Sequence, residues 1–163
     1  MIPCMMRRAA ALIPMLAFEI FAQSSPGVSV QVPGGKPVVF SRADLAAMPM
    51  TTLNVTDHDK PASFEGVALD LLLTKAGLPS GEKLHGKAAA LIVVIDAADK
   101  YRAVYALAEV DPSFSSRQVI LALRRDGKDL AGAEGPYRVI ATGEKRAARW
   151  IRQVQRITVQ EAR

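Results

Sequence analysis

The stretch "FEGVALDLLLTKAG", residues 64–77, contains the clearest helix signal in the sequence. Its apolar residues recur every three or four positions, which is the spacing of one helix face. The residues on that face are Leu69, Leu72, Leu73 and Ala76. Gly77 suits the left-handed position that ends many helices, and Pro79 prevents the helix from continuing. We therefore predict one amphipathic helix that packs against a core.

Runs of β-branched and apolar residues on both sides of this helix predict strands. The predicted strands are residues 28–32, 38–40, 51–56, 88–96, 101–107, 118–125, 137–142 and 156–160. Ser41 and Asp44 have the spacing of a capping box for a short helix that Pro49 ends. The segments 57–66 and 80–87 are polar and predict loops. Many strands with few helices predict an α+β domain, with a mixed β-sheet and few short helices.

The N-terminus has the pattern of a secretory signal peptide. Arg7 and Arg8 precede the apolar run "AAALIPMLAF", and the small residue Ala22 precedes a polar segment. We expect cleavage after Ala22, export to the periplasm or the cell exterior, and a mature domain of residues 23–163 without a transmembrane segment. The alternative is an uncleaved N-terminal anchor. The arginine pair leaves the choice between the general secretory and the twin-arginine route open.

Cys4 is the only cysteine, and it lies ahead of the predicted cleavage point. The mature domain would therefore have no disulfide, thiolate metal site or cysteine nucleophile. Loss of residues 1–22 would remove Arg7, Arg8 and Glu19, a net +1, and would leave +4 of the formal charge of +5. A basic exported domain favours small anionic ligands or acidic protein partners. Nucleic acid is not expected as a partner, because export removes the domain from it and aromatic residues, at 6%, are sparse.

Five segments between Phe64 and Val159 together resemble one protein family. They are "FEGVALDLLLTKAG", "IDAADKYRAVYALAEVD", "VILALRRDGKDL", "EGPYRVIAT" and "ARWIRQVQRITV". In the same order the family has "W-x-G-V-x-L-x-x-L-L", a "D-G-Y" turn between two strands, "L-L-A-x-x-x-x-G-x-x-L", "H-G-x-P-x-R-x-V-x-P", and a tryptophan before the last strand. The set resembles the oxidoreductase molybdopterin-binding domain, the fold of sulfite oxidases and related bacterial molybdoenzymes. The resemblance implies that fold, with molybdopterin as a candidate cofactor.

Three departures from the family pattern bear on function. The resemblance implies that molybdenum is held by a pterin dithiolene and one protein cysteine in the loop before the helix, whereas residues 53–66 contain no cysteine. Glu134 occupies the position of the family histidine, and a carboxylate there would repel a pterin phosphate. Lys100 replaces the glycine of the "D-G-Y" turn. The departures make a bound molybdenum ion doubtful, although the fold is still expected.

Two of the candidate cofactor contacts come directly from the family motifs. Arg138 matches the family arginine, so the resemblance implies contact with a cofactor phosphate or a substrate oxyanion, a role that suits a planar guanidinium. The alternative is that Arg138 pairs with an acidic neighbour. Tyr101 matches the tyrosine of the "D-G-Y" turn. The other candidates belong to the densest cationic cluster, which consists of Lys145, Arg146, Arg149 and Arg152. This cluster is an anion pocket, a docking patch for an acidic partner or a solvated loop.

Other residues carry weaker signals. Asp57, His58 and Asp59 have side chains that bind divalent ions, but adjacent residues seldom converge on one ion, so we predict a polar loop and no metal site. Trp150, the only tryptophan, is either a core anchor or a stacking platform. The sequence contains no "G-x-S-x-G" elbow, no glycine-rich phosphate loop and no dinucleotide fingerprint.

Three functions are consistent with these observations. The first, which we favour, is an exported, non-catalytic binding module that keeps the sulfite-oxidase-type fold and binds a small anionic ligand or a partner protein in the ancestral cofactor cleft. The second is a molybdopterin-dependent oxidoreductase whose metal has oxygen or nitrogen ligands in place of cysteine. The third is an accessory subunit of a periplasmic redox or signalling system, which would expose an apolar patch rather than a polar cleft.

Overall fold

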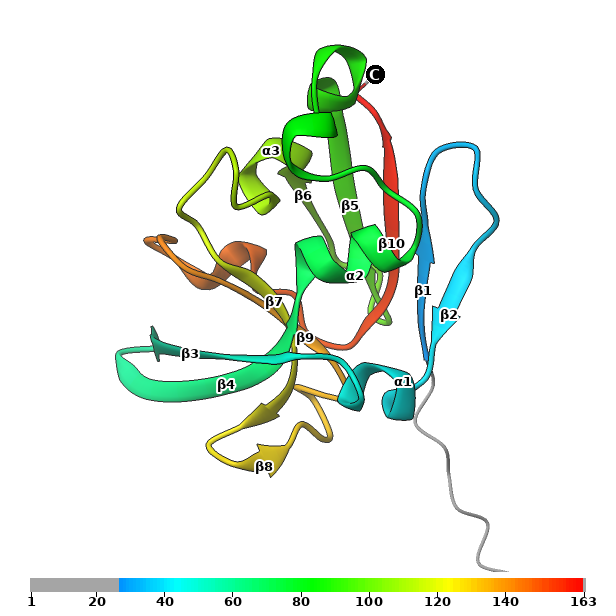
Figure 1. Cartoon of the computed structure of the whole chain (residues 1–163). Helices are drawn as coiled ribbons and strands as arrows, with labels where there is room; N and C mark the ends of the chain where they lie inside the picture. Colours follow the sequence, from blue (N-terminus) through cyan, green and yellow to red (C-terminus); the bar gives the residue numbers. More distant parts are fainter. Residues whose placement is uncertain (1–26, 163) are drawn as a thin grey trace, which may run out of the picture.

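Two β-sheets dominate the computed structural model, which describes residues 27–162 (Figure 1). The first sheet has the strand order β2–β1–β10–β5–β6. Its strands are β1 (Val28–Gln31), β2 (Val38–Phe40), β5 (Leu91–Ala97), β6 (Arg102–Ala106) and β10 (Val154–Glu161). β1 and β10 pair in parallel, whereas the other pairs are antiparallel, so this sheet is mixed as predicted. The predicted signal peptide, residues 1–22, lies outside the described residues.

The second sheet is antiparallel throughout and has the order β3–β4–β7–β8, with β9 also paired to β7. Its strands are β3 (Met50–Asp57), β4 (Lys60–Ala68), β7 (Val119–Arg125), β8 (Lys128–Asp129) and β9 (Arg138–Ala141). β7 and β8 are joined at Asp126-Gly127, a dipeptide typical of two-residue hairpin turns. All the residues of β9 are buried.

The helices are short, as predicted for this fold class. They are α1 (Arg42–Ala46), α2 (Leu69–Lys75), α3 (Leu107–Val110) and the 3₁₀ helices η1 (Gly81–Lys83), η2 (Gly86–Ala90) and η3 (Ala147–Arg149). The predicted capping box of α1 is confirmed, because Ser41 Oγ accepts from the Asp44 N–H at 3.2 Å and the Asp44 carboxylate accepts from the Ser41 N–H at 2.8 Å. α2 buries all three leucines predicted for its inner face, and Gly77 follows it with a φ of +100°.

The predicted loop over residues 57–66 is wrong for most of its length, because β4 begins at Lys60. Only His58 and Asp59 form the turn, and both have positive φ angles, 50° and 63°. Such two-residue turns match the twist of paired strands, so a polar sequence can continue as a hairpin. Gly66 has a packing role in β4: a Cβ there would lie 2.2 Å from the Leu121 carbonyl oxygen in β7.

Two further boundaries differ from the sequence expectation. The predicted loop over residues 80–87 contains η1 and the start of η2, and the predicted strand over 88–96 begins only at Leu91. The alanines at 88–90 belong to η2, whose end turns the chain into β5. Alanine suits a helical turn at least as well as a strand, so the apolar run over 88–96 does not show where η2 ends and β5 begins.

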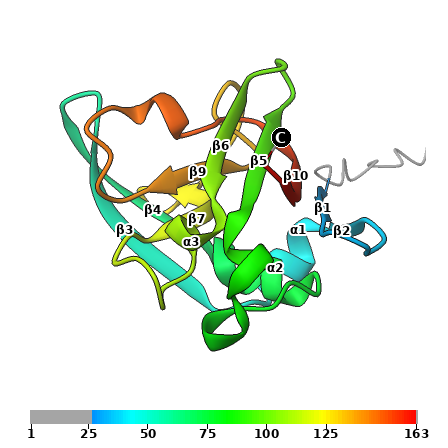
Figure 2. The same ribbon diagram turned by 90° about the horizontal axis from the view of Figure 1, so that it is seen from above.

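Side chains from both sheets and from α2 share one hydrophobic core. At one end of that core, the β3–β4 and β5–β6 hairpin tips and the loop after β9 lie close together, with the loop running between the tips in Figure 2. Within the described range, no helix is long and apolar enough to cross a membrane. The loop after β9 contains the basic segment that the sequence singled out, so this end of the molecule holds the candidate site.

Candidate functional site

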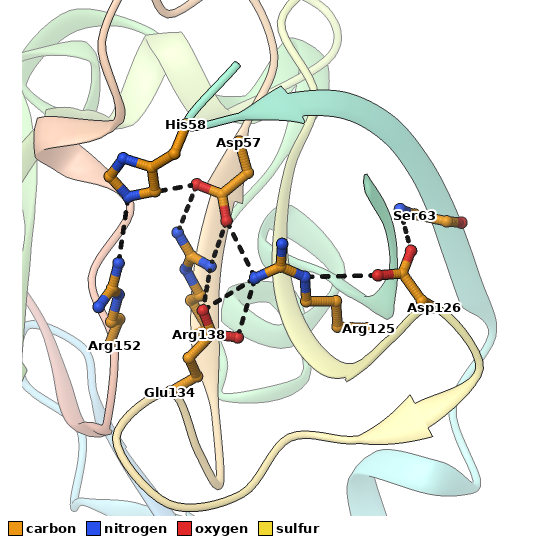
Figure 3. Close-up of polar contacts among 8 residues, drawn as sticks. All are labelled: Asp57, His58, Ser63, Arg125, Asp126, Glu134, Arg138 and Arg152. Atoms are coloured by element: carbon orange, nitrogen blue, oxygen red, sulfur yellow. Dashed lines mark hydrogen bonds and ion pairs between the residues drawn. The ribbon is translucent and has the colours of Figure 1, made fainter. Parts of the chain in front are cut away.

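A buried ion pair between Asp57 and Arg138 lies beneath the candidate site (Figure 3). Arg138 donates from one terminal nitrogen to Asp57 Oδ2 at 2.9 Å and from the other to Oδ1 at 3.1 Å. Both side chains are 1% exposed. Asp57 is the last residue of β3 and Arg138 the first of β9, so the pair joins two strands that are not neighbours in the sheet.

Arg125 and Glu134 extend this pair into a four-residue cluster. A terminal nitrogen of Arg125 lies 3.2 Å from Asp57 Oδ2 and 2.9 Å from Glu134 Oε1, and Arg138 lies 3.2 Å from the same glutamate oxygen. Two guanidinium groups and two carboxylates therefore balance in formal charge. The Glu134 carboxylate, which occupies the position of the family histidine, is engaged by both arginines.

Aromatic rings flank the buried guanidinium. The Cζ atom of Arg138 lies 5.1 Å from the centre of the Phe64 ring and 5.8 Å from that of Trp150. Trp150 donates from its indole nitrogen to the Ala141 carbonyl at 3.0 Å and is 7% exposed. These contacts favour the core-anchor interpretation of Trp150 over the stacking platform. The rings also lower the local dielectric constant around Arg138, which strengthens its electrostatic interaction with Asp57.

The Arg138 guanidinium controls the ionisation of Asp57. Burial by itself would raise the pKa of the Asp57 carboxyl. The hydrogen bonds and the charge of Arg138, together with the charges of Arg125 and His58, outweigh burial and hold that pKa below its ordinary value of 3.8. Asp57 is therefore ionised near neutral pH, and its negative charge is already matched by Arg138.

A pocket of about 650 Å³ lies next to this cluster. Three segments supply nearly all of its wall: the β3–β4 tip, the β5–β6 turn and the loop after β9. The lining residues are Thr56, His58, Asp59, Asp99, Tyr101, Arg138, Glu144, Lys145, Arg146, Ala147, Ala148, Trp150, Ile151 and Arg152. The wall combines exposed charges of both signs with the Tyr101 ring, which is 48% exposed. Its volume lies in the range of small-molecule sites.

The structure brings four of the five predicted contact residues to this pocket: Tyr101, Arg138, Lys145 and Arg146. Lys145 and Arg146 are exposed, and among residues 27–162 no carboxylate lies within ion-pair distance of either. Arg152, a third member of the cationic cluster, also lines the pocket. A terminal nitrogen of Arg152 lies 3.3 Å from His58 Nε2.

Arg149 does not line the pocket, which corrects its inclusion with the other cations. Its guanidinium pairs with Glu109 at 3.0 Å and with Glu144, and it lies 4.5 Å from the centre of the Tyr105 ring. The physical reason is η3, which turns the chain within this loop so that neighbouring basic residues point in different directions. Arg149 therefore ties the loop to β6 and α3.

Asp57 was not predicted from the sequence as the partner of Arg138. The alternation along β3 contained a usable signal, because Asp57 lies on the same face as the buried Leu53. A carboxylate at an inward position requires a buried cation or hydrogen-bond donors. Asp59 and Asp99 were also missed as pocket residues, and no local pattern distinguishes them from other turn aspartates.

Residues 58–163 match the family model described as the oxidoreductase molybdopterin binding domain. The chain belongs to this family. The α+β fold predicted from the family resemblance is thereby confirmed. Comparison with curated proteins found no match.

A solved structure supports the same fold. The chain is similar to the sulfane dehydrogenase SoxCD from Paracoccus pantotrophus, with a TM-score of 0.64 and 20% sequence identity. The similarity covers 84% of this chain and 38% of that one. The chain thus spans well under half the length of this structural relative. At this identity the likeness shows the fold alone.

The family description raises the question whether the pocket suits molybdopterin. Among residues 27–162, the side chains that line it offer hydroxyl, imidazole, carboxylate, ammonium and guanidinium groups but no thiolate. Across the described part of the chain, no three histidine, cysteine or acidic residues are grouped so as to hold a metal ion. The exposed cations Lys145, Arg146 and Arg152 suit a phosphate group. The residues present therefore fit the anionic part of molybdopterin and do not fit its molybdenum.

Proposed function

We propose that this domain is a binding module that takes a small anionic ligand in the pocket between the β3–β4 tip, the β5–β6 turn and the loop after β9. One observation carries the proposal: three exposed cations, Lys145, Arg146 and Arg152, line a pocket of about 650 Å³ without a carboxylate partner in residues 27–162. Unpaired cations around a concave site attract anions and orient their oxygens.

The anion would bind at the rim of this pocket and not at Arg138. Arg138 already donates two hydrogen bonds to Asp57 and lies within 3.2 Å of Glu134. An incoming anion would have to displace a buried carboxylate whose removal is strongly unfavourable. Lys145, Arg146 and Arg152 need no such displacement, because they are exposed to solvent. They would bind weakly at physiological salt, since exposed charges are screened.

A titration with inorganic phosphate tests this function. We expect phosphate to shift the amide resonances of the β3–β4 tip and the loop after β9 in a saturable way, and more weakly as NaCl is added. The triple variant Lys145→Gln/Arg146→Gln/Arg152→Gln should lose this binding. The control Lys75→Gln/Lys83→Gln/Lys128→Gln removes the same charge from exposed positions outside the pocket and should keep it. Equal binding by both triple variants would contradict the proposal.

The second candidate is a molybdopterin-dependent oxidoreductase, which family membership favours. Elemental analysis and pterin fluorescence on protein purified from its native host decide between the two. Stoichiometric molybdenum with pterin would establish the second candidate. A folded sample with neither would leave the binding module. The two measurements together also detect a pterin that is bound without metal.

Export and an acidic partner protein remain part of the proposal. The signal pattern in residues 1–22 supports a periplasmic or secreted location, where the domain would serve a redox or signalling partner. The intact mass of the protein from its host tests this idea, because cleavage after Ala22 leaves Gln23 at the N-terminus. A full-length mass in the cytoplasmic fraction would contradict it.

A further inference from the structure

Charges of opposite sign line the candidate pocket without pairing with one another. Lys145, Arg146 and Arg152 face the same space as Asp59 and Asp99. Within residues 27–162, no charged nitrogen or carboxylate oxygen of these five side chains lies within 4.0 Å of an oppositely charged one. The two carboxylates would repel a ligand that carries only negative charge. The pocket therefore presents complementary groups for both signs.

The β5–β6 turn supplies a place for a cation. Asp99 Oδ1 accepts a hydrogen bond from the Tyr101 N–H at 2.9 Å, which fixes the carboxylate beside the tyrosine. The Tyr101 hydroxyl donates to the Ala148 carbonyl at 2.8 Å, which holds the ring against the loop after β9. An ammonium group bound here would be stabilised by the negative charge of the carboxylate and by a cation–π interaction with the exposed ring.

The β3–β4 tip positions one of the cations. Arg152 lies 3.3 Å from His58 Nε2, so its guanidinium is held next to the hairpin while its remaining donors stay available. The His58 side chain is 72% exposed. A planar guanidinium with free N–H donors can bind a carboxylate through two parallel hydrogen bonds, in bidentate geometry. The tip and the turn belong to different sheets, and both line this pocket.

We infer that the ligand is a small zwitterion, with its ammonium group at Asp99 and Tyr101 and its carboxylate or phosphate at Arg152 and the neighbouring Lys145 and Arg146. This inference rests on the proposed anion site and deepens it by naming the ligand class. A ligand with both charges neutralises both sets of side chains at once. A purely anionic ligand leaves Asp59 and Asp99 facing a like charge.

Three probes of equal length separate the contributions: 6-aminohexanoate carries both charges, hexanoate only the negative one, and hexylammonium only the positive one. Amide resonances of the ¹⁵N-labelled protein at low ionic strength give the dissociation constants. We expect 6-aminohexanoate to bind about two- to fivefold more tightly than either of the others, since an exposed charge contact contributes about that much.

Variants of the lining residues test which side chains bind the ammonium group and which bind the carboxylate. Asp99→Asn should reduce the affinity for 6-aminohexanoate to that for hexanoate, and Lys145→Gln/Arg146→Gln/Arg152→Gln should reduce it to that for hexylammonium, with Arg152→Gln alone giving part of that loss. Glu82→Gln and Lys83→Gln make the same charge changes in η1, outside the pocket, and should leave the preference intact.

The outcomes distinguish this inference from the function on which it rests. If hexanoate binds as tightly as 6-aminohexanoate, the zwitterion inference is overturned and the anion site stands. If none of the three probes and no phosphate shifts the pocket amides, both are overturned. If 6-aminohexanoate binds more tightly but Asp99→Asn keeps that advantage, the placement of the ammonium group is wrong.

Discussion

At the scale of single residues, the Asp57–Arg138 pair decides how the site can be used. Among the ion pairs within residues 27–162, it is the only one in which both side chains are buried. Its two hydrogen bonds and the adjacent rings of Phe64 and Trp150 leave the guanidinium committed to the interior. Arg138 thus has a structural role here, and under the proposed function the exposed cations of the rim would recognise the ligand.

Removing one partner of this pair should destabilise the fold strongly. We expect Asp57→Ala to lower the free energy of unfolding by about 3 kcal/mol, because Arg138 stays buried with less compensation. The double variant Asp57→Leu/Arg138→Met should be more stable than Asp57→Ala, since it removes both charges together. Urea unfolding followed by circular dichroism measures both. As a control, Asp126→Asn changes a carboxylate that is 57% exposed and should cost less than about 1 kcal/mol.

The same pair predicts that the stability of the fold decreases as the pH becomes acidic. The folded pKa of Asp57 is lowered, so its contribution to stability is complete above the ordinary value of 3.8 and disappears as the pH falls through the folded pKa. We expect the stability to decline from about pH 4.5 downward. In Asp57→Asn this decline should be shallower. Identical slopes for the two proteins would show that Asp57 does not carry the effect.

At the scale of elements, the two hairpin turns beside the pocket contain residues with positive φ angles that are not glycine. His58 and Asp59 have φ angles of 50° and 63°, and Lys100 has a φ of 71°. L-residues are strained in this region. The family motif has glycine where this chain has Lys100, so the β5–β6 turn keeps its shape with a residue that suits it less well.

Lys100→Gly should therefore stabilise the protein. We expect a gain of about 0.5–1 kcal/mol, because relief of the left-handed strain exceeds the extra entropy that glycine has in the unfolded chain. Lys100→Ala keeps the Cβ and should give no such gain, which separates the backbone effect from loss of the charge. Thermal unfolding of the three proteins at one pH is sufficient. Equal stabilities of the glycine and alanine variants would refute the strain argument.

At the scale of the whole molecule, the loop after β9 serves two purposes. One set of its side chains, Lys145 and Arg146, faces the pocket, and Arg149 binds back onto Glu109 and Glu144. The loop joins β9 of the second sheet to β10 of the first, so its conformation connects the two sheets at the site. Binding and folding should therefore respond differently to neighbouring basic residues.

Variants of this loop should separate the two purposes. We expect Arg149→Gln to lower the free energy of unfolding by about 1–2 kcal/mol while the folded protein still binds phosphate. Lys145→Gln/Arg146→Gln should change stability by less than about 0.5 kcal/mol and weaken phosphate binding. Chemical unfolding and amide titration on the same samples measure both quantities. The opposite assignment of effects would place Arg149 in the binding site.

The sequence by itself determined the family, the fold class, the capping box of α1, the apolar face of α2 and most of the strands. These features depend on periodicity, turn chemistry and ordered motifs, which are local along the chain. Tertiary structure alone decided that Asp57 meets Arg138, 81 residues away, and that Lys145 and Arg149 face different partners. Charge pairing depends on which strands lie near each other and on how a loop turns. The alternation along β3 indicates that Asp57 points inward, but no local pattern identifies Arg138 as its partner.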